Sequence, residues 1–232
     1  PPLVSVLSLL LNWSLFANSV HTFDIRISSI ALLKAYFNEN HGLKKIFIEQ
    51  EIAQYKLINN TIEDGSDFVL RTNVFETIMD YDPDLKLNPY KLFFATDLLM
   101  YLFQSESSVT ELRDLARKLN SGNDSAGEEV LSSIQTICEL LLTTLSTEDA
   151  RIPISYLSFL IFWLFEDVKA VDDFLSNRSI VYSLIAFSSQ IEDEDVTVKC
   201  LITILLGVAY EFSSKESPFP REELYELLTK SI

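Results

Sequence analysis

The sequence predicts an all-α protein, built as an array of stacked helical repeats, because one pattern recurs along the chain. Four apolar helical stretches end in aromatic residues next to carboxylates or amides, and a short second helix follows most of them. Only 5 glycines and 7 prolines occur among 232 residues, of which 48% are apolar, and this favours packed helices over a β-sandwich. The four endings lie at 35–39, 101–106, 163–167 and 209–212, and the short helices are expected at 42–47, 108–119, 168–177 and 220–230.

The first half of the chain opens with an apolar stretch, Leu3–Ala17, that is similar to the apolar part of a signal peptide. It has no basic flank and contains Asn12 and Trp13, so we interpret it as a helix of the protein core. Asn88–Pro89 predicts a helix start, with a side-chain acceptor at the N-cap and proline at the first helical position. Phe68–Met79 fits either a helix or a strand, and we interpret it as a helix.

The second half contains the clearest amphipathic stretch, Glu128–Leu145. Its apolar residues recur at spacings of three and four, as on one face of a helix: Val130, Leu131, Ile134, Ile137, Cys138, Leu141, Leu142 and Leu145. Ile154–Phe165 and Leu201–Tyr210 are apolar on all sides and are predicted to be buried helices, since a membrane span needs about 20 residues. Ser108–Glu111 fits a capping box, and Pro220 precedes carboxylates that suit a helix N-terminus.

Loops are expected where Asn, Asp, Ser, Gly and Pro gather. These breaks are 59–66, 81–88, 120–127, 147–151, 190–195 and 213–218. None is long enough to be a flexible linker, so we predict a single domain over 1–232, with repeat units at roughly 1–66, 67–150, 151–190 and 191–232. No heptad pattern persists for three repeats, which argues against a coiled coil in this segment.

The formal net charge of −16 limits the classes of partner. A surface this negative repels phosphate backbones and anionic lipid headgroups, so we expect no binding to nucleic acid. No transmembrane segment is expected either. A basic protein patch is the natural electrostatic partner, although keeping an apolar-rich chain in solution is also a sufficient reason for the charge.

The residues that hydrolytic catalysis needs are missing or badly placed. Only His21 and His41 occur, and both are interpreted as solvated residues in breaks between helices. The sequence contains no HExxH, no CxxC and no histidine cluster, which argues against the common zinc sites. We therefore expect no catalytic residue, no cofactor, no cofactor-binding residue and no metal ligand. A pocket that holds either histidine beside a buried carboxylate would revive the alternative of a helical hydrolase.

Three groups of neighbouring carboxylates are also not expected to bind a metal ion or to act in catalysis. The run Glu192–Asp195 lacks the alternate spacing and the glycine of a calcium loop, so we expect a solvated turn. Adjacent residues on a helix point about 100° apart, so Asp172–Asp173 and Glu128–Glu129 are not expected to converge on a substrate.

Burial or chance explains several other residues. Cys138 and Cys200 lie in apolar helical runs and are predicted to be buried free thiols in a reducing compartment. Chance explains the Asn-x-Ser/Thr sequons at Asn12, Asn59, Asn123 and Asn177. The aromatic residues at helical spacing, such as Phe93, Phe159 and Phe165, fit a core, but an aromatic groove for a partner helix gives the same pattern.

Three stretches together resemble a known family. They are Asn88–Leu119, Ile154–Gln190 and, above all, Val198–Phe212, which contains the Leu205-Leu206-Gly207 motif before its aromatic end and is followed by a helix from Pro220. In this order they resemble the globular head of the vesicle-tethering factor of endoplasmic reticulum-to-Golgi transport, in the general vesicular transport factor family, and in particular a fungal member. The resemblance covers most of the chain and is weakest between 56 and 86, where we suspect a lineage-specific insertion.

The resemblance implies an armadillo-like α-solenoid, of which this chain would form the C-terminal half of a larger head. It implies a non-catalytic scaffold that docks transport vesicles to Golgi membranes, peripheral on the cytoplasmic face of the Golgi and of ER-derived vesicles. It also implies a homodimer with a coiled-coil tail outside this segment, and a Rab GTPase, SNARE proteins and other Golgi tethering factors as partners. No partner-binding residue can be assigned. The alternative is a generic cytosolic armadillo or HEAT-type adaptor, of the formin-regulatory or nuclear-transport kind.

Overall fold

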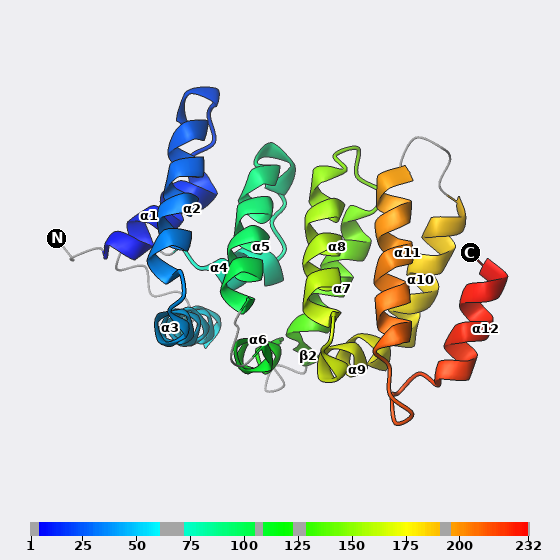
Figure 1. Ribbon diagram of the computed structural model, residues 1–232. Coiled ribbons are helices and arrows are strands. Elements are labelled where there is room, and N and C mark those ends of the chain that lie inside the picture. Colours follow the sequence, from blue (N-terminus) through cyan, green and yellow to red (C-terminus); the bar gives the residue numbers. More distant parts are fainter. Residues whose placement is uncertain (1–4, 61–71, 105–108, 123–128, 191–195, 232) are drawn as a thin grey trace. The chain divides into compact units, whose positions relative to one another are not determined.

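The computed structural model describes residues 5–60, 72–104, 109–122, 129–190 and 196–231, and nearly all their regular structure is helical (Figure 1). The chain divides into two compact units, Pro1–Ala116 and Arg117–Ile232, and each is considered by itself. The predicted all-α fold of stacked, armadillo-like helices is confirmed. The division into four repeats within one domain stays a prediction.

Unit 1 has its core between α5 and the helices that surround it. Its elements are α1 (Val6–Phe16), η1 (Val20–Thr22), α2 (Phe23–Phe37), α3 (His41–Asn60), α4 (Val74–Met79), η2 (Leu85–Leu87), α5 (Pro89–Phe103) and α6 (Val109–Arg117), which ends at the first residue of unit 2. α5 packs against α1, α2 and α4, while α3 packs against α2 and α4. Leu33, Phe37, Phe75, Leu98 and Phe103 are fully buried there.

Unit 2 places α8 and α11 side by side, with α7 and α10 behind them (Figure 1). Its elements are β1 (Asn120–Ser121), β2 (Leu131–Ser132), α7 (Ser133–Thr144), α8 (Arg151–Leu164), α9 (Val168–Ser176), α10 (Arg178–Gln190), α11 (Val196–Glu211) and α12 (Arg221–Ser231). α8 packs against α7, α9 and α11, and Leu160, Trp163, Phe174 and Leu205 are fully buried. The prediction that Ile154–Phe165 forms a buried helix is thus confirmed for α8, apart from its exposed end.

Two helix predictions are wrong in length. The short helix expected at 42–47 is the start of α3, which has 20 residues, because the polar residues after Phe47 occupy its solvent face while Ile48 and Tyr55 stay buried. The helix expected over 128–145 begins only at Ser133, since Leu131–Ser132 pairs with Asn120–Ser121 as a short antiparallel ribbon. Ser132 and Gln135 form a capping box that stops the helix at this point.

The burial predicted for Phe93 and Cys200 is wrong. Phe93 on α5 is 46% exposed, and α1, in the predicted core helix Leu3–Ala17, buries Leu11 and Leu15 but leaves Trp13 and Phe16 43% and 45% exposed. Cys138 is buried as predicted, but Cys200 is exposed, because only one face of α11 packs against its neighbours and Cys200 lies on the other. Both cysteines are free.

One buried cation, Arg26, binds both the C-terminal end of α1 and the residue that precedes α5. Arg26 is fully buried, and its Nη2 donates to the carbonyl oxygen of Leu15 at 2.6 Å and to Asn88 Oδ1 at 3.0 Å. Asn88 stands at the predicted N-cap of α5, but its side chain does not cap that helix and its Nδ2 donates to Leu15 instead. Burial lowers the pKa of Arg26, and the C-terminal dipole of α1 compensates this charge in place of a carboxylate.

Several predictions concern residues outside the described ranges. Residues 72–79 of the predicted helix 68–79 are described; Val74–Met79 is helical, whereas Thr72 and Asn73 precede the helix and Asn73 is its N-cap. The acidic run 192–195, Asn123, Glu128 and Ser108 of the expected capping box lie outside the description, as does most of the break at 59–66.

Candidate interaction surface

Two of the aromatic helix ends recognised in the sequence form the same tight corner. After α2, Glu39 has a φ of 53°, and after α8, Glu166 has a φ of 57°. The next residue caps the following helix in both cases: Asn40 Oδ1 accepts from the Leu43 N–H at 3.0 Å, and Asp167 Oδ1 accepts from the Ala170 N–H at 3.1 Å. Left-handed backbone at a residue other than glycine costs roughly 1 kcal/mol, so both corners are held by the packing around them.

The corner between α8 and α9 exposes an aromatic pair. The rings of Phe165 and Phe212 meet edge to face with centroids 5.1 Å apart, and Phe165 is 48% exposed. Val168, the first residue of α9, is 46% exposed. We call these three residues the aromatic corner. Phe165 therefore departs from the core position that its spacing predicted, while Phe159 and Trp163 on α8 are buried.

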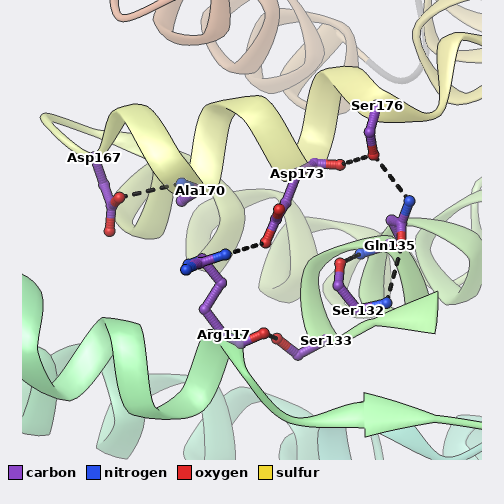
Figure 2. Close-up of polar contacts among 8 residues, drawn as sticks. All are labelled: Arg117, Ser132, Ser133, Gln135, Asp167, Ala170, Asp173 and Ser176. Atoms are coloured by element: carbon purple, nitrogen blue, oxygen red, sulfur yellow. Dashed lines mark hydrogen bonds and ion pairs between the residues drawn. The ribbon is translucent and has the colours of Figure 1, made fainter. Parts of the chain in front are cut away.

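Polar contacts fix α9, which begins at this corner, on Arg117 and on α7 (Figure 2). Arg117 Nη1 donates to Asp173 Oδ2 at 3.0 Å, with the two side chains 20% and 26% exposed. Gln135 Nε2 donates to Ser176 Oγ at 2.9 Å, and Ser176 Oγ donates to the Asp173 carbonyl oxygen. The backbone carbonyl oxygen of Arg117 also accepts from Ser133 Oγ at the start of α7, so Arg117 binds both α7 and α9.

On its other side, α9 is bound to the loop that follows α11. Ser217 Oγ donates to Asp172 Oδ1, and Ser213 Oγ donates to the Tyr210 carbonyl oxygen at the end of α11. Asp172 and Asp173 thus bind different partners and do not converge, as predicted from their spacing. The two anchors place Phe165 and Phe212 on a fixed frame, and rigid exposed aromatic residues are common anchors in protein interfaces.

The charges beside the aromatic corner are mixed. Glu166 and Glu211 are exposed next to the two rings, and Arg221 lies 3.7 Å from Glu211 and 4.6 Å from the centroid of the Tyr210 ring. Lys169 is exposed on the first turn of α9. The corner itself is therefore not strongly acidic, although the chain as a whole is.

His41 is not the solvated turn residue that the sequence suggested. It is the first residue of α3, and its Nε2 lies 2.8 Å from Glu111 Oε2 on α6, while Lys45 Nζ donates to Glu111 Oε1 at 2.6 Å. Hydrogen bonds from Lys45 and His41 lower the pKa of Glu111 to about 2, and Glu111 raises the pKa of Lys45. The arrangement joins α3 to α6. His21 is exposed in η1.

The described ranges contain neither a candidate metal site nor a helix that could span a membrane. No group of three or more His, Cys, Asp or Glu side chains there could hold a metal ion. No helix in that part of the chain is both long and apolar enough to cross a bilayer.

Sequence reasoning missed the contacts that build the surface. The Arg117–Asp173 pair joins residues 56 positions apart, so no local pattern announces it. Glu39 and Glu166 have a left-handed backbone, but neither position is a glycine, which is the usual sequence signal for that conformation. The available signal was the side-chain acceptor before each predicted short helix: Asn40 two residues before 42–47, and Asp167 directly before 168–177.

A second apolar surface lies on unit 1. Ile25, Leu32 and Tyr36 recur at helical spacing on one side of α2 and are 45%, 57% and 49% exposed, and α1 carries the exposed Trp13 and Phe16. Large exposed apolar residues that share one side of a helix are candidates for a binding surface.

Comparison with known proteins gives a consistent result. A model of the head region of Uso1/p115-like vesicle tethering proteins matches residues 1–232. The "Intracellular protein transport protein USO1" of Saccharomyces cerevisiae is 48% identical over 261 aligned residues, which cover 99% of this chain and 14% of that protein. The corresponding protein of Schizosaccharomyces pombe is 25% identical, over 89% of this chain and 19% of that protein.

Solved structures agree with the sequence matches. Two crystal structures of Uso1 superpose on 99% of this chain with TM-scores of 0.89 and 0.90, at 51% and 52% sequence identity. This chain spans 33% of each of those chains.

Proposed function

The chain belongs to the Uso1/p115-like vesicle tethering protein head family, and from this membership we propose that it is part of a non-catalytic scaffold that docks transport vesicles to Golgi membranes. The observation that carries the proposal is the match of the family model to the whole chain, together with 48% identity to the Saccharomyces protein. The matches reported above give no support to the alternative, an adaptor of the formin-regulatory or nuclear-transport kind.

The proposal includes the binding partners of the protein and its location in the cell. A Rab GTPase, SNARE proteins and other Golgi tethering factors are the proposed partners, and the full-length protein is proposed to be a homodimer. The proposed location is the cytoplasmic face of the Golgi and of ER-derived vesicles, where the protein would be peripheral. Helices stacked only against their neighbours leave long surfaces free for such partners, which supports a scaffold rather than an enzyme.

We also propose that this segment is one part of a larger helical head. The chain spans 33% of each Uso1 crystal chain, and the exposed apolar side of α1 and α2 is what an inner surface of a longer stack presents. A further helical pair of the same protein would cover Leu32 and Tyr36. The expected result in the longer protein is slower hydrogen exchange at α2 than in the isolated chain, and equal exchange would contradict the proposal.

The function can be tested by replacement in yeast. The matching region of Saccharomyces USO1 is exchanged for this chain, the native copy is depleted, and the arrival of secretory cargo at the Golgi is followed in a pulse-chase experiment. We expect transport close to the parental rate, and none when the region is deleted. A stable chimera that reaches the Golgi and transports no cargo would refute the proposal. The same chimera with Phe165→Ala, compared with Ile204→Ala at a site of equal exposure, asks whether the aromatic corner takes part.

A further inference from the structure

One face of α3 holds both ends of α4. Glu51 and Tyr55 are one turn apart on α3 and are 7% and 1% exposed. Glu51 Oε2 accepts from the N–H of Val74, the first residue of α4, at 2.8 Å. Tyr55 donates from its hydroxyl to Oδ1 of Asp80, the residue that follows α4, at 2.8 Å. The two contacts clamp a helix of six residues from its start to its end.

Within the described residues, the Glu51 end of this clamp is buried among polar groups and has no basic partner. Asn73 Nδ2 donates to the Glu51 carbonyl oxygen at 2.7 Å, so backbone and side chain of Glu51 both bind the start of α4. No lysine or arginine forms an ion pair with Glu51 in the described part of the chain. Among the described residues, the charged groups that face this region include Glu76 and Asp80 from α4 and its C-cap, and Lys91 from α5, which acts on Asp80. A buried carboxylate without a cation is costly, whereas a buried carboxylic acid is not.

We propose that the packing of α4 onto α3 is a proton-dependent closure, in which Glu51 as a neutral acid holds α4 in place and its ionisation favours release. The inference concerns a movement inside unit 1 and is independent of the tethering role. Release would uncover Val74, Phe75 and Ile78, which are fully buried in the closed form, so the closure controls access to an apolar surface.

The pH range follows from the chemistry of Glu51. Burial, the largest cause, raises its pKa to about 7, nearby Glu76 acts in the same direction, and the Val74 N–H acts in the opposite one. A carboxyl group whose pKa is higher in the closed form than in the open form binds more protons when closed. The closed form is therefore favoured at low pH, and this advantage is lost as the pH rises from about 4.5 to about 7.

Hydrogen exchange measures the closure directly. The N–H groups of Thr77 and Asp80 bond to Asn73 and Glu76 within and beside α4, so their protection reports whether α4 is formed and packed. After correction for the intrinsic pH dependence of exchange, we expect their protection factors to fall by about tenfold between pH 6 and pH 8. Glu51→Gln keeps an acceptor for Val74 without a charge, and its protection should change less than about twofold over the same range.

The matched control is Glu49→Gln, two residues earlier on α3 at an exposed position, which should behave like the parent chain. The carboxyl carbon chemical shift of Glu51 in the unmodified chain gives a second measurement that needs no variant. A midpoint near 7 supports the closure. A midpoint near 4.5, or the same pH dependence of protection in Glu51→Gln as in the parent, would overturn it.

Discussion

The ammonium group of Lys44 lies 2.6 Å from the carbonyl oxygen of Gln104, where α5 has just ended. Lys44 comes from α3, is 7% exposed, and also donates to the Tyr101 carbonyl oxygen at 3.3 Å. Its Nζ lies 4.8 Å from the centroid of the Tyr101 ring. A buried cation on the C-terminal carbonyls of a helix thus joins α3 to α5.

Replacing Lys44 tests this role. Lys44→Met keeps most of the apolar stem but removes the donors, and we expect the free energy of unfolding to fall by about 1–2 kcal/mol, measured by urea denaturation. Lys56→Met, at an exposed position on the same helix, should change it by less than about 0.5 kcal/mol. Equal effects at the two positions would show that Lys44 does not stabilise the end of α5.

The Arg117–Asp173 pair should contribute a measurable coupling. Its side chains are mostly buried, so a double-mutant cycle with Arg117→Gln and Asp173→Asn is expected to give about 1 kcal/mol. The comparison pair is Arg178–Glu223, whose side chains are 47% and 44% exposed and whose coupling should be near zero. If both cycles give the same coupling, the frame beneath the aromatic corner does not depend on Arg117.

The two cysteines should differ in reactivity. Cys200 is exposed, so a maleimide should modify it within minutes under native conditions. Cys138 is fully buried, which raises the pKa of its thiol, and it should react only when the protein opens. Peptide mass spectrometry after a timed pulse separates the two sites, and similar rates would contradict the burial of α7.

The positions of several helix ends could be predicted because they depend on the local order of apolar and polar residues. α2, α5 and α11 end inside the predicted segments 35–39, 101–106 and 209–212. What the sequence could not provide is the identity of the neighbours. Whether Cys200 is buried depends on how many helices pack around α11, and the periodicity of 128–145 does not show that Ser132 belongs to a ribbon.

The candidate surface was harder to predict than the fold for the same reason. Phe165 has the spacing of a core residue, but it is the C-cap of α8 with an extended backbone, and its side chain is 48% exposed. In the sequence, Glu51 cannot be distinguished from the other carboxylates of α3, and its burial follows only from the packing of α4. Long-range packing decides both cases, while helix formation depends mainly on residues within a few turns.

Relief of the left-handed backbone should stabilise the corners. Glu166→Gly is expected to raise the free energy of unfolding by about 1 kcal/mol, because glycine adopts a φ near 57° without steric cost. Glu139→Gly, at an exposed helical position in α7, should lower it by about the same amount, since glycine weakens a helix interior. A loss of stability in Glu166→Gly would mean that the Glu166 side chain contributes more than its backbone costs.

Two glycines of unit 2 should respond oppositely to the same substitution. Gly122 has a φ of 82°, and a Cβ there would collide with the Glu129 carbonyl oxygen, so Gly122→Ala should cost at least about 2 kcal/mol. Gly207 lies inside α11 with open space around the added methyl group, so Gly207→Ala should stabilise by about 0.5–1 kcal/mol. Because a backbone clash cannot be relieved by a side-chain movement, urea denaturation of the two variants tests the ribbon that displaced the predicted start of α7. A tolerated Gly122→Ala would require residues 129–132 to lie elsewhere, and the helix could then begin where its periodicity does.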